Sequence, residues 1–118
     1  MKIENAIASI AVKDLRAASA WYEKLFGKPA DSRPMPEVAE WKFPGGGWLQ
    51  IYQLPERAGA GSCTLAVDDI EGLIAHLQTL GIDTSERTSG PKVRTVMITD
   101  PDDNHLAFAH AIDPTIAR

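Results

Sequence analysis

The clearest chemical signal in the chain is the alternation of Trp48, Gln50 and Tyr52. Successive side chains of a β-strand point to opposite faces, so these three share one face, while Leu49 and Ile51 share the other. Two aromatic rings around one amide can stack on a planar ligand and orient it by hydrogen bonds. The rings could equally form a dimer contact or fill a closed cleft, and the sequence favours neither interpretation.

Other reactive residue types are scattered and do not predict catalysis. His76 lies on the flank of a helical apolar stripe, and His105 is typical of a polar residue at the rim of a binding face. His110 has the opposite facing to His105 along the same segment. Cys63 is expected to be a small buried residue rather than a nucleophile. No Ser-His-Asp or Cys-His arrangement is evident.

The acidic run from Asp100 to Asn104 superficially resembles a calcium loop. An EF-hand loop needs Gly at its sixth position and Glu at its twelfth, and here those positions hold His105 and Ala111. We therefore expect a turn, with Asp103 in the left-handed region that Asp tolerates better than most residues. The glycine run 45–47 lacks the Lys-Ser/Thr of a phosphate loop and is also expected to be a turn.

An internal repeat organises the elements that position these residues. A shift of 55 residues places 10–15 on 65–70, and a shift of 57 places 49–51 on 106–108. The small-residue segment 55–61 joins the two copies. The repeat predicts one domain over residues 1–118, with one module at about 3–55 and a second at about 61–112.

Each copy reads as a strand, a helix and further strands. Asp14 and Asp69 are expected to cap the two helices, which end near Gly27 and Gly81. The pattern predicts an α+β protein made of two tandem βαβββ modules. Hairpin strands are expected at 38–43 with 48–53 and at 93–99 with 105–109, and a short strand directly after each helix, near 27–31 and 81–85.

Composition sets outer limits on function. The chain has 118 residues, 44% of them hydrophobic and 24% charged, as in ordinary globular domains. The net charge of −4 does not predict the basic surface that binds nucleic acid or an anionic membrane. No apolar run approaches the roughly 20 residues that span a bilayer, and no export signal is evident. The single cysteine excludes an intramolecular disulfide, so a cytoplasmic setting is expected.

The duplicated unit resembles the vicinal oxygen chelate superfamily, which includes glyoxalase I, extradiol dioxygenases, and fosfomycin and bleomycin resistance proteins. The resemblance implies a curved sheet with helices on its convex face and a pocket on its concave face. Relatives of the bleomycin-resistance branch form dimers, which implies a homodimer here. The motifs that carry the resemblance are Ala11–Leu15 followed by Trp21–Gly27, then Val67–Ile70, and finally Asp100–Leu106.

The resemblance also assigns four positions where metal-using relatives place His, Glu or Gln. Here these positions hold Ile7, Gln50, Ser62 and Ala107. Ile7 and Ala107 have no donor atom, and a neutral serine is a poor ligand. Gln50 alone offers a carbonyl oxygen. We therefore expect no metal, no cofactor and no catalytic residue.

The leading hypothesis is a metal-independent protein that binds an aromatic or amphipathic small molecule in the concave cleft, as bleomycin resistance proteins do. The cleft is expected to carry no carboxylate. The alternatives are a metal-dependent lyase or oxidoreductase of the glyoxalase or dioxygenase type, using residues such as Gln50, His105 and Glu40, and a module without a ligand. The expected ligand-binding residues are Trp48, Gln50, Tyr52, Ser62, Thr64, Met97, His105 and Ala107.

Overall fold

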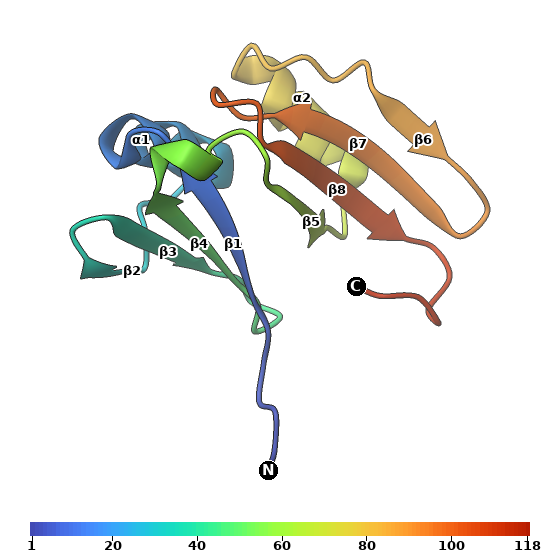
Figure 1. Ribbon diagram of the computed structural model, residues 1–118. Coiled ribbons are helices and arrows are strands. Elements are labelled where there is room, and N and C mark those ends of the chain that lie inside the picture. The colour runs from blue at the N-terminus through green and yellow to red at the C-terminus, as the bar shows by residue number, and fades with distance from the viewer. The chain divides into compact units, whose positions relative to one another are not determined.

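A computed structural model describes all 118 residues, which form two compact units (Figure 1). Unit 1 consists of residues 1–61 and 101–104, and unit 2 of residues 62–100 and 105–118. Each unit holds one α-helix and one four-stranded mixed sheet. The predicted fold class, an α+β protein of tandem βαβββ modules, is confirmed. Neither helix is long and apolar enough to cross a membrane.

Unit 1 has its strands in the order β1-β4-β3-β2. β1 and β4 are parallel, and the other neighbouring pairs are antiparallel. A short 3-10 helix, η1, follows the last strand. The elements are β1 (Ile7–Val12), α1 (Leu15–Phe26), β2 (Ser32–Met35), β3 (Val38–Lys42), β4 (Trp48–Gln53) and η1 (Pro55–Arg57).

Unit 2 repeats this topology with the order β5-β8-β7-β6. Its register confirms the internal repeat, because Ser9 pairs with Gln50 in unit 1, and Thr64 pairs with Ala107 in unit 2. These pairs are related by the same shifts of 55 and 57 residues that the sequence shows. The elements are β5 (Ser62–Ala66), α2 (Ile70–Thr79), β6 (Arg87–Ser89), β7 (Val93–Thr99) and β8 (His105–Ala111).

The helix ends follow the predicted capping. The Asp14 carboxylate accepts a hydrogen bond from the Arg16 amide at 3.0 Å, which satisfies a donor in the first turn of α1. Asp69 does the same for α2 through the Gly72 amide, also at 3.0 Å. α1 ends at Gly27, whose φ of 73° lies in the left-handed region that glycine adopts without strain.

The second strand of each unit begins later than predicted. Residues 27–31 and 81–85 are not strands, and β2 begins at Ser32 and β6 at Arg87. In unit 1 the Asp31 carboxylate accepts from the Lys42 amide at 2.8 Å and so takes a donor at the end of β3. In unit 2 the Asp83 carboxylate accepts from the Ser85 amide at 2.9 Å, which forms a turn. In unit 1 the Asp31 amide also donates to Glu40 O at 2.8 Å, so a backbone hydrogen bond to β3 is kept just before β2 begins.

Two strand ends also differ from the expected ones. β3 ends at Lys42 rather than residue 43, because the Phe43 amide bonds Gly47 O at 2.9 Å in the turn. β8 continues to Ala111 instead of ending at 109, because Ala111 pairs with Val93 at the start of β7. The hairpins are otherwise placed as predicted.

The core of unit 1 is aromatic and lies between α1 and one face of its sheet. Tyr22 and Trp41 are fully buried, with ring centroids 6.2 Å apart. Phe26 adds a third ring at 5.7 Å from Trp41. The buried indole of Trp41 donates to Lys28 O at 3.0 Å, so its polar atom is satisfied. Trp41 is therefore a core residue, whereas Trp21 is only half-buried.

The core of unit 2 is mainly aliphatic. One stripe of α2 is buried, and it faces the alternate residues of β7 and β8 that are also buried. This alternation is the period-2 pattern of a sheet with one covered face. The buried set is Ile70, Ile74, Leu77, Val96, Ile98, Leu106 and Phe108.

The turn 101–104 belongs to unit 1, although it joins two strands of unit 2. Asn104 is fully buried, and its Nδ2 donates to Ala11 O at 2.8 Å. Its Oδ1 accepts from the amides of Gly59 at 3.1 Å and Gly61 at 2.9 Å. One side chain thus satisfies three backbone groups of unit 1.

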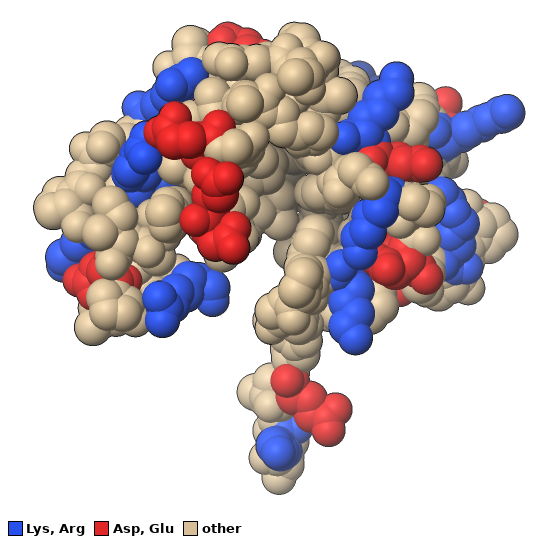
Figure 2. Space-filling model, turned by 180° about the vertical axis from the view of Figure 1, so that it is seen from behind, with Lys and Arg blue, Asp and Glu red and all other residues tan.

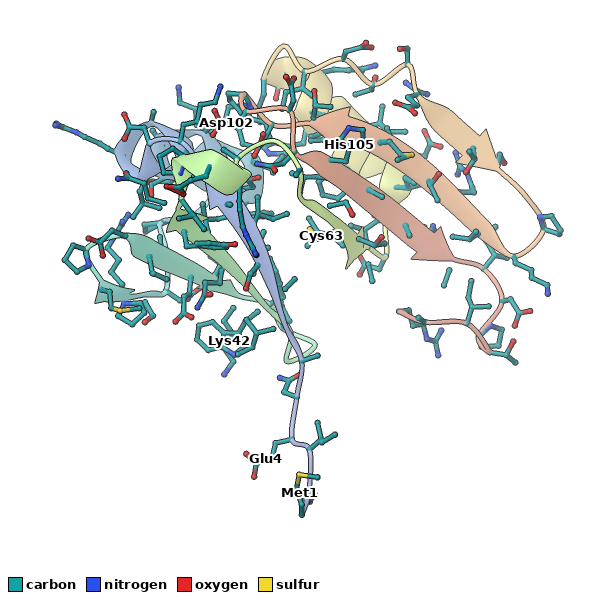
Figure 3. All side chains as sticks on the ribbon, in the orientation of Figure 1. Met1, Glu4, Lys42, Cys63, Asp102 and His105 are labelled. Atoms are coloured by element: carbon teal, nitrogen blue, oxygen red, sulfur yellow. The ribbon has the colours of Figure 1, made fainter.

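The same turn shows why it is not a calcium loop. The Asp102 carboxylate (labelled in Figure 3) accepts from the Lys13 amide at 2.9 Å. Asp103 has φ 73° and is the one non-glycine residue with positive φ, as predicted. The acidic run is therefore used for backbone hydrogen bonds and turn geometry.

Candidate functional site

The open face of unit 1 is the sheet face opposite its buried one. On β4, Leu49 and Ile51 are fully buried, whereas Trp48, Gln50 and Tyr52 are half-buried on the other side, as the alternation predicts. Strand register arranges the open face in three rows. They are Ile7–Trp48–Lys42, Ser9–Gln50–Glu40 and Ala11–Tyr52–Val38.

The middle row is a hydrogen-bonded chain that fixes the Gln50 amide. Gln50 Oε1 accepts from the Ser9 hydroxyl at 3.3 Å, and Gln50 Nε2 donates to Glu40 Oε2 at 2.9 Å. Both ends of the amide are therefore held, so its orientation is set before a ligand arrives. One hydrogen on Nε2 and the second oxygen of Glu40 remain available to a ligand.

The carboxylate of Glu40 corrects the sequence-based prediction of a face without one. Glu40 pairs directly with Gln50 across the β3–β4 hairpin, so both side chains lie on the same face. The sequence contained the information needed to place Glu40 on this face. A hairpin turn at residues 44–47 pairs residue 40 with residue 50. Its neighbours Ala39 and Trp41 are fully buried on the other face of that strand.

The two rings stand on either side of this polar row. The ammonium of Lys42 (labelled in Figure 3) lies 5.7 Å from the centroid of the Trp48 ring, within cation–π range. Trp48 and Tyr52 are four residues apart on one strand, which separates their backbone positions by about 13 Å. Gln50 lies midway between the two rings along the strand.

The open face of unit 2 holds the remaining predicted residues. Its register places Ser62 beside His105, and Thr64 beside Ala107, which in turn pairs with Met97. These five share one face, and small side chains and hydroxyls dominate it. His105 is exposed at the start of β8 (Figure 3). The predicted set of eight therefore falls into two groups, one on each unit.

Cys63 lies on the opposite side of β5 from Ser62 and Thr64 and is half-buried (Figure 3). Burial raises the pKa of its thiol to about 11. The thiolate is the nucleophilic form, so this cysteine is unreactive at neutral pH.

The metal that the superfamily resemblance implies does not fit the residues present. Ile7 and Ala107 carry no donor atom, and the Gln50 carbonyl oxygen already accepts from the Ser9 hydroxyl. Neither unit brings three or more His, Cys, Asp or Glu side chains together. The four assigned positions therefore cannot form the usual coordination shell.

Comparison with known proteins identifies the protein family to which the chain belongs. A family model described as a glyoxalase-like domain matches residues 7–109. The chain belongs to this glyoxalase-like family, within the bleomycin resistance and glyoxalase superfamily that its motifs resemble. No protein of curated function matches the sequence.

Three solved structures illustrate the relationship. A glyoxalase/bleomycin resistance protein from Catenulispora acidiphila is 32% identical, with a TM-score of 0.81 over 91% of this chain and 97% of that one. The antibiotic-binding protein TnmS3 from Streptomyces is 21% identical, with a TM-score of 0.79 over 93% and 97%. A lactoylglutathione lyase from Agrobacterium tumefaciens is 17% identical, with a TM-score of 0.75 over 93% and 95%. The last two likenesses show the fold alone.

Proposed function

We propose that this protein binds a small planar aromatic molecule on the open face of unit 1, without a metal ion and without changing it chemically. The observation that carries the proposal is the fixed row of Ser9, Gln50 and Glu40 between the rings of Trp48 and Tyr52. Apolar burial and ring contacts would supply affinity, and the polar row would supply orientation.

The chemistry of the row narrows the ligand further. Glu40 accepts hydrogen bonds, and the spare Gln50 hydrogen donates one. A ring system that carries an amine or a protonated ring nitrogen beside an acceptor atom would satisfy both groups. Lys42 sits at the Trp48 end, so a ligand would place its positive group toward Glu40 and away from Lys42.

The second open face extends the proposal. Met97 and Ala107, with the hydroxyls of Ser62 and Thr64, offer an apolar surface with weak hydrogen-bonding groups, and His105 offers a polar edge. Taken by itself, this face suits an apolar or weakly polar ligand. Sequestration by a homodimer belongs to the same proposal. Of its parts, the binding of a small molecule is supported by the antibiotic-binding protein TnmS3, which has the same fold.

Bleomycin and the planar aromatic cation proflavine are suitable first probes. We expect at least one of them to raise the melting temperature of protein dialysed against EDTA, because a ligand of the folded state stabilises it. Trp48→Ala should weaken binding about tenfold in calorimetry and leave the fold intact. Ile112→Ala, which removes an exposed apolar side chain from unit 2, is the control. Absent stabilisation by both probes, or unchanged affinity in Trp48→Ala, would refute the proposal.

A metal-dependent enzyme is the second candidate, and one observation favours it. The Glu40 carboxylate lies on the open face, hydrogen-bonded to Gln50 Nε2 at 2.9 Å, and its second oxygen is a candidate metal ligand. Calorimetric titration with Zn²⁺, Ni²⁺ and Mn²⁺ decides between the candidates. Stoichiometric binding that Glu40→Gln abolishes would favour the enzyme, whereas equal weak binding by both proteins would favour the metal-independent function.

A further inference from the structure

A separate pocket lies on the helix side of unit 1, away from its open face. It has a volume of about 430 Å³, within the range of small-molecule sites. One face of α1 forms one wall, and β2, the turn after it and the end of β4 complete the lining. The residues used below are Arg16, Ser19, Glu23, Arg33 and Gln53.

Ser19 is the first sign that this pocket receives a ligand. The residue is only 7% exposed, and its hydroxyl oxygen is buried with no hydrogen-bond partner. Serine within a helix usually bonds the carbonyl four residues earlier or faces water, and this hydroxyl does neither. A buried, unsatisfied hydroxyl lowers stability, and a ligand that enters this pocket would supply the missing partner.

Two arginines supply the second sign. Arg16 on α1 and Arg33 on β2 line the same pocket, and neither forms an ion pair. Paired guanidinium groups match the geometry of a carboxylate. The start of α1 does not compete for this role, because Leu15 N is bonded to Gln53 Oε1 at 2.9 Å and Arg16 N to Asp14.

Glu23 makes the pocket selective. Arg16, Ser19 and Glu23 follow one another at helical spacing along one face of α1, and Glu23 forms no ion pair. The acidic Asp14 and Glu23 balance the two arginines, so the lining has no net charge. Figure 2 likewise shows basic and acidic side chains interspersed over the surface. A zwitterion suits such a site better than an anion.

We propose that this pocket binds a small zwitterion whose carboxylate lies between Arg16 and Arg33, near Ser19, and whose ammonium lies at Glu23. Arg16 and Glu23 are seven residues apart, or about 10 Å along the helix axis. The two charges of the ligand are therefore separated by several bonds, as in an ω-amino acid, rather than attached to one carbon.

Three probes of matched length test the charge pattern: 6-aminohexanoate, hexanoate and adipate. In titrations followed by amide NMR shifts, we expect 6-aminohexanoate to bind most tightly and adipate least, with saturable shifts at Ser19 and along α1. Arg33→Gln should weaken 6-aminohexanoate binding about tenfold. Arg57→Gln makes the same charge change at an exposed site outside the pocket and should have no effect.

Two further variants separate a ligand site from a structural feature. Glu23→Gln should abolish the preference for 6-aminohexanoate over hexanoate. Ser19→Ala should weaken binding and leave the melting temperature unchanged or raised, because the unsatisfied hydroxyl is removed. Shifts that do not saturate, or affinities that are the same in wild type and Arg33→Gln, would overturn the proposal. None of the residues changed here lies on the open face, so this test and that of the proposed function fail independently.

Discussion

Units 1 and 2 share one topology but differ in the chemistry of their open faces. At the centre of the unit 1 face, Gln50 is hydrogen-bonded between Ser9 and Glu40. At the equivalent point of unit 2, Ala107 lies beside Thr64. The register of the strands is the same in both copies. The buried alternate positions thus preserve the fold, and the open ones are free to diverge toward binding.

The two cores differ as well. Unit 1 packs the rings of Tyr22, Phe26 and Trp41 together, whereas unit 2 buries aliphatic side chains of α2 such as Leu77 against its sheet. Large rings remove more apolar surface from water per residue than aliphatic side chains do. Single substitutions in the two cores therefore measure how each unit is stabilised.

The largest effect is expected from truncating these cores. Trp41→Ala should lower the free energy of unfolding by about 3–5 kcal/mol, since it leaves a large cavity and an unpaired Lys28 carbonyl. Leu77→Ala in unit 2 should cost about 2–5 kcal/mol. Urea denaturation followed by circular dichroism provides both values. A loss below about 1 kcal/mol for Trp41→Ala would show that the rings of unit 1 do not form its core.

The next largest loss of stability is expected from a change in the turn 101–104, which belongs to unit 1. Asn104→Ala removes three hydrogen bonds, one to the buried Ala11 carbonyl and two from the partly buried amides of Gly59 and Gly61. We expect a loss of about 2–4 kcal/mol. Asn5→Ala, the same substitution at an exposed site, should cost about 0.5 kcal/mol or less. Equal losses in the two variants would contradict the role given to Asn104.

Sequence periodicity predicted the elements with strong local signals. Alternation placed Trp48 and Gln50 on one face of β4, and side-chain chemistry placed the caps at Asp14 and Asp69, because both depend on neighbours along the chain. β2 and β6 were misplaced because they are short, polar edge strands without alternation. Pro34 in β2 further weakens its strand signal.

Long-range contacts were harder to predict. Asn104 contacts Ala11 across 93 residues of sequence, and no local pattern reports such a pairing. Glu40 could have been placed from the hairpin register. The pocket at Ser19 and Arg33 was not predictable, because residues on a helix face and an edge strand look like ordinary surface until tertiary structure brings them together.

A smaller change in stability is expected from substituting Asp103 in the turn 101–104. Asp103 adopts φ 73°, a conformation that costs free energy for any residue with a side chain. Asp103→Gly should raise the free energy of unfolding by about 0.5–1 kcal/mol, the size of the effect when backbone strain is relieved. Thermal denaturation measures this change. A lower melting temperature would mean that the Asp103 side chain makes a stabilising contact larger than the strain.

The smallest effect is expected at the carboxylates that precede the second strand of each unit, Asp31 and Asp83. The Lys28 ammonium, then the Lys42 amide, holds the pKa of Asp31 below its usual range. Hydrogen bonds from the Ser85 amide and then its hydroxyl lower that of Asp83. A carboxyl with a depressed folded pKa stabilises the protein above its unfolded pKa, and the contribution disappears as pH falls through the folded pKa.

Asp31→Asn and Asp83→Asn should therefore each reduce stability at pH 7, and each loss should disappear as the pH falls through the folded pKa of the wild-type carboxyl. Both groups are exposed, so the losses should be small. Added salt should diminish the loss for Asp31→Asn, which removes an ion pair with Lys28, more than that for Asp83→Asn, which removes hydrogen bonds to neutral groups. Melting temperatures at two pH values and two salt concentrations distinguish the cases. A salt response of equal size in both variants would show that the Lys28 pair contributes nothing particular to unit 1.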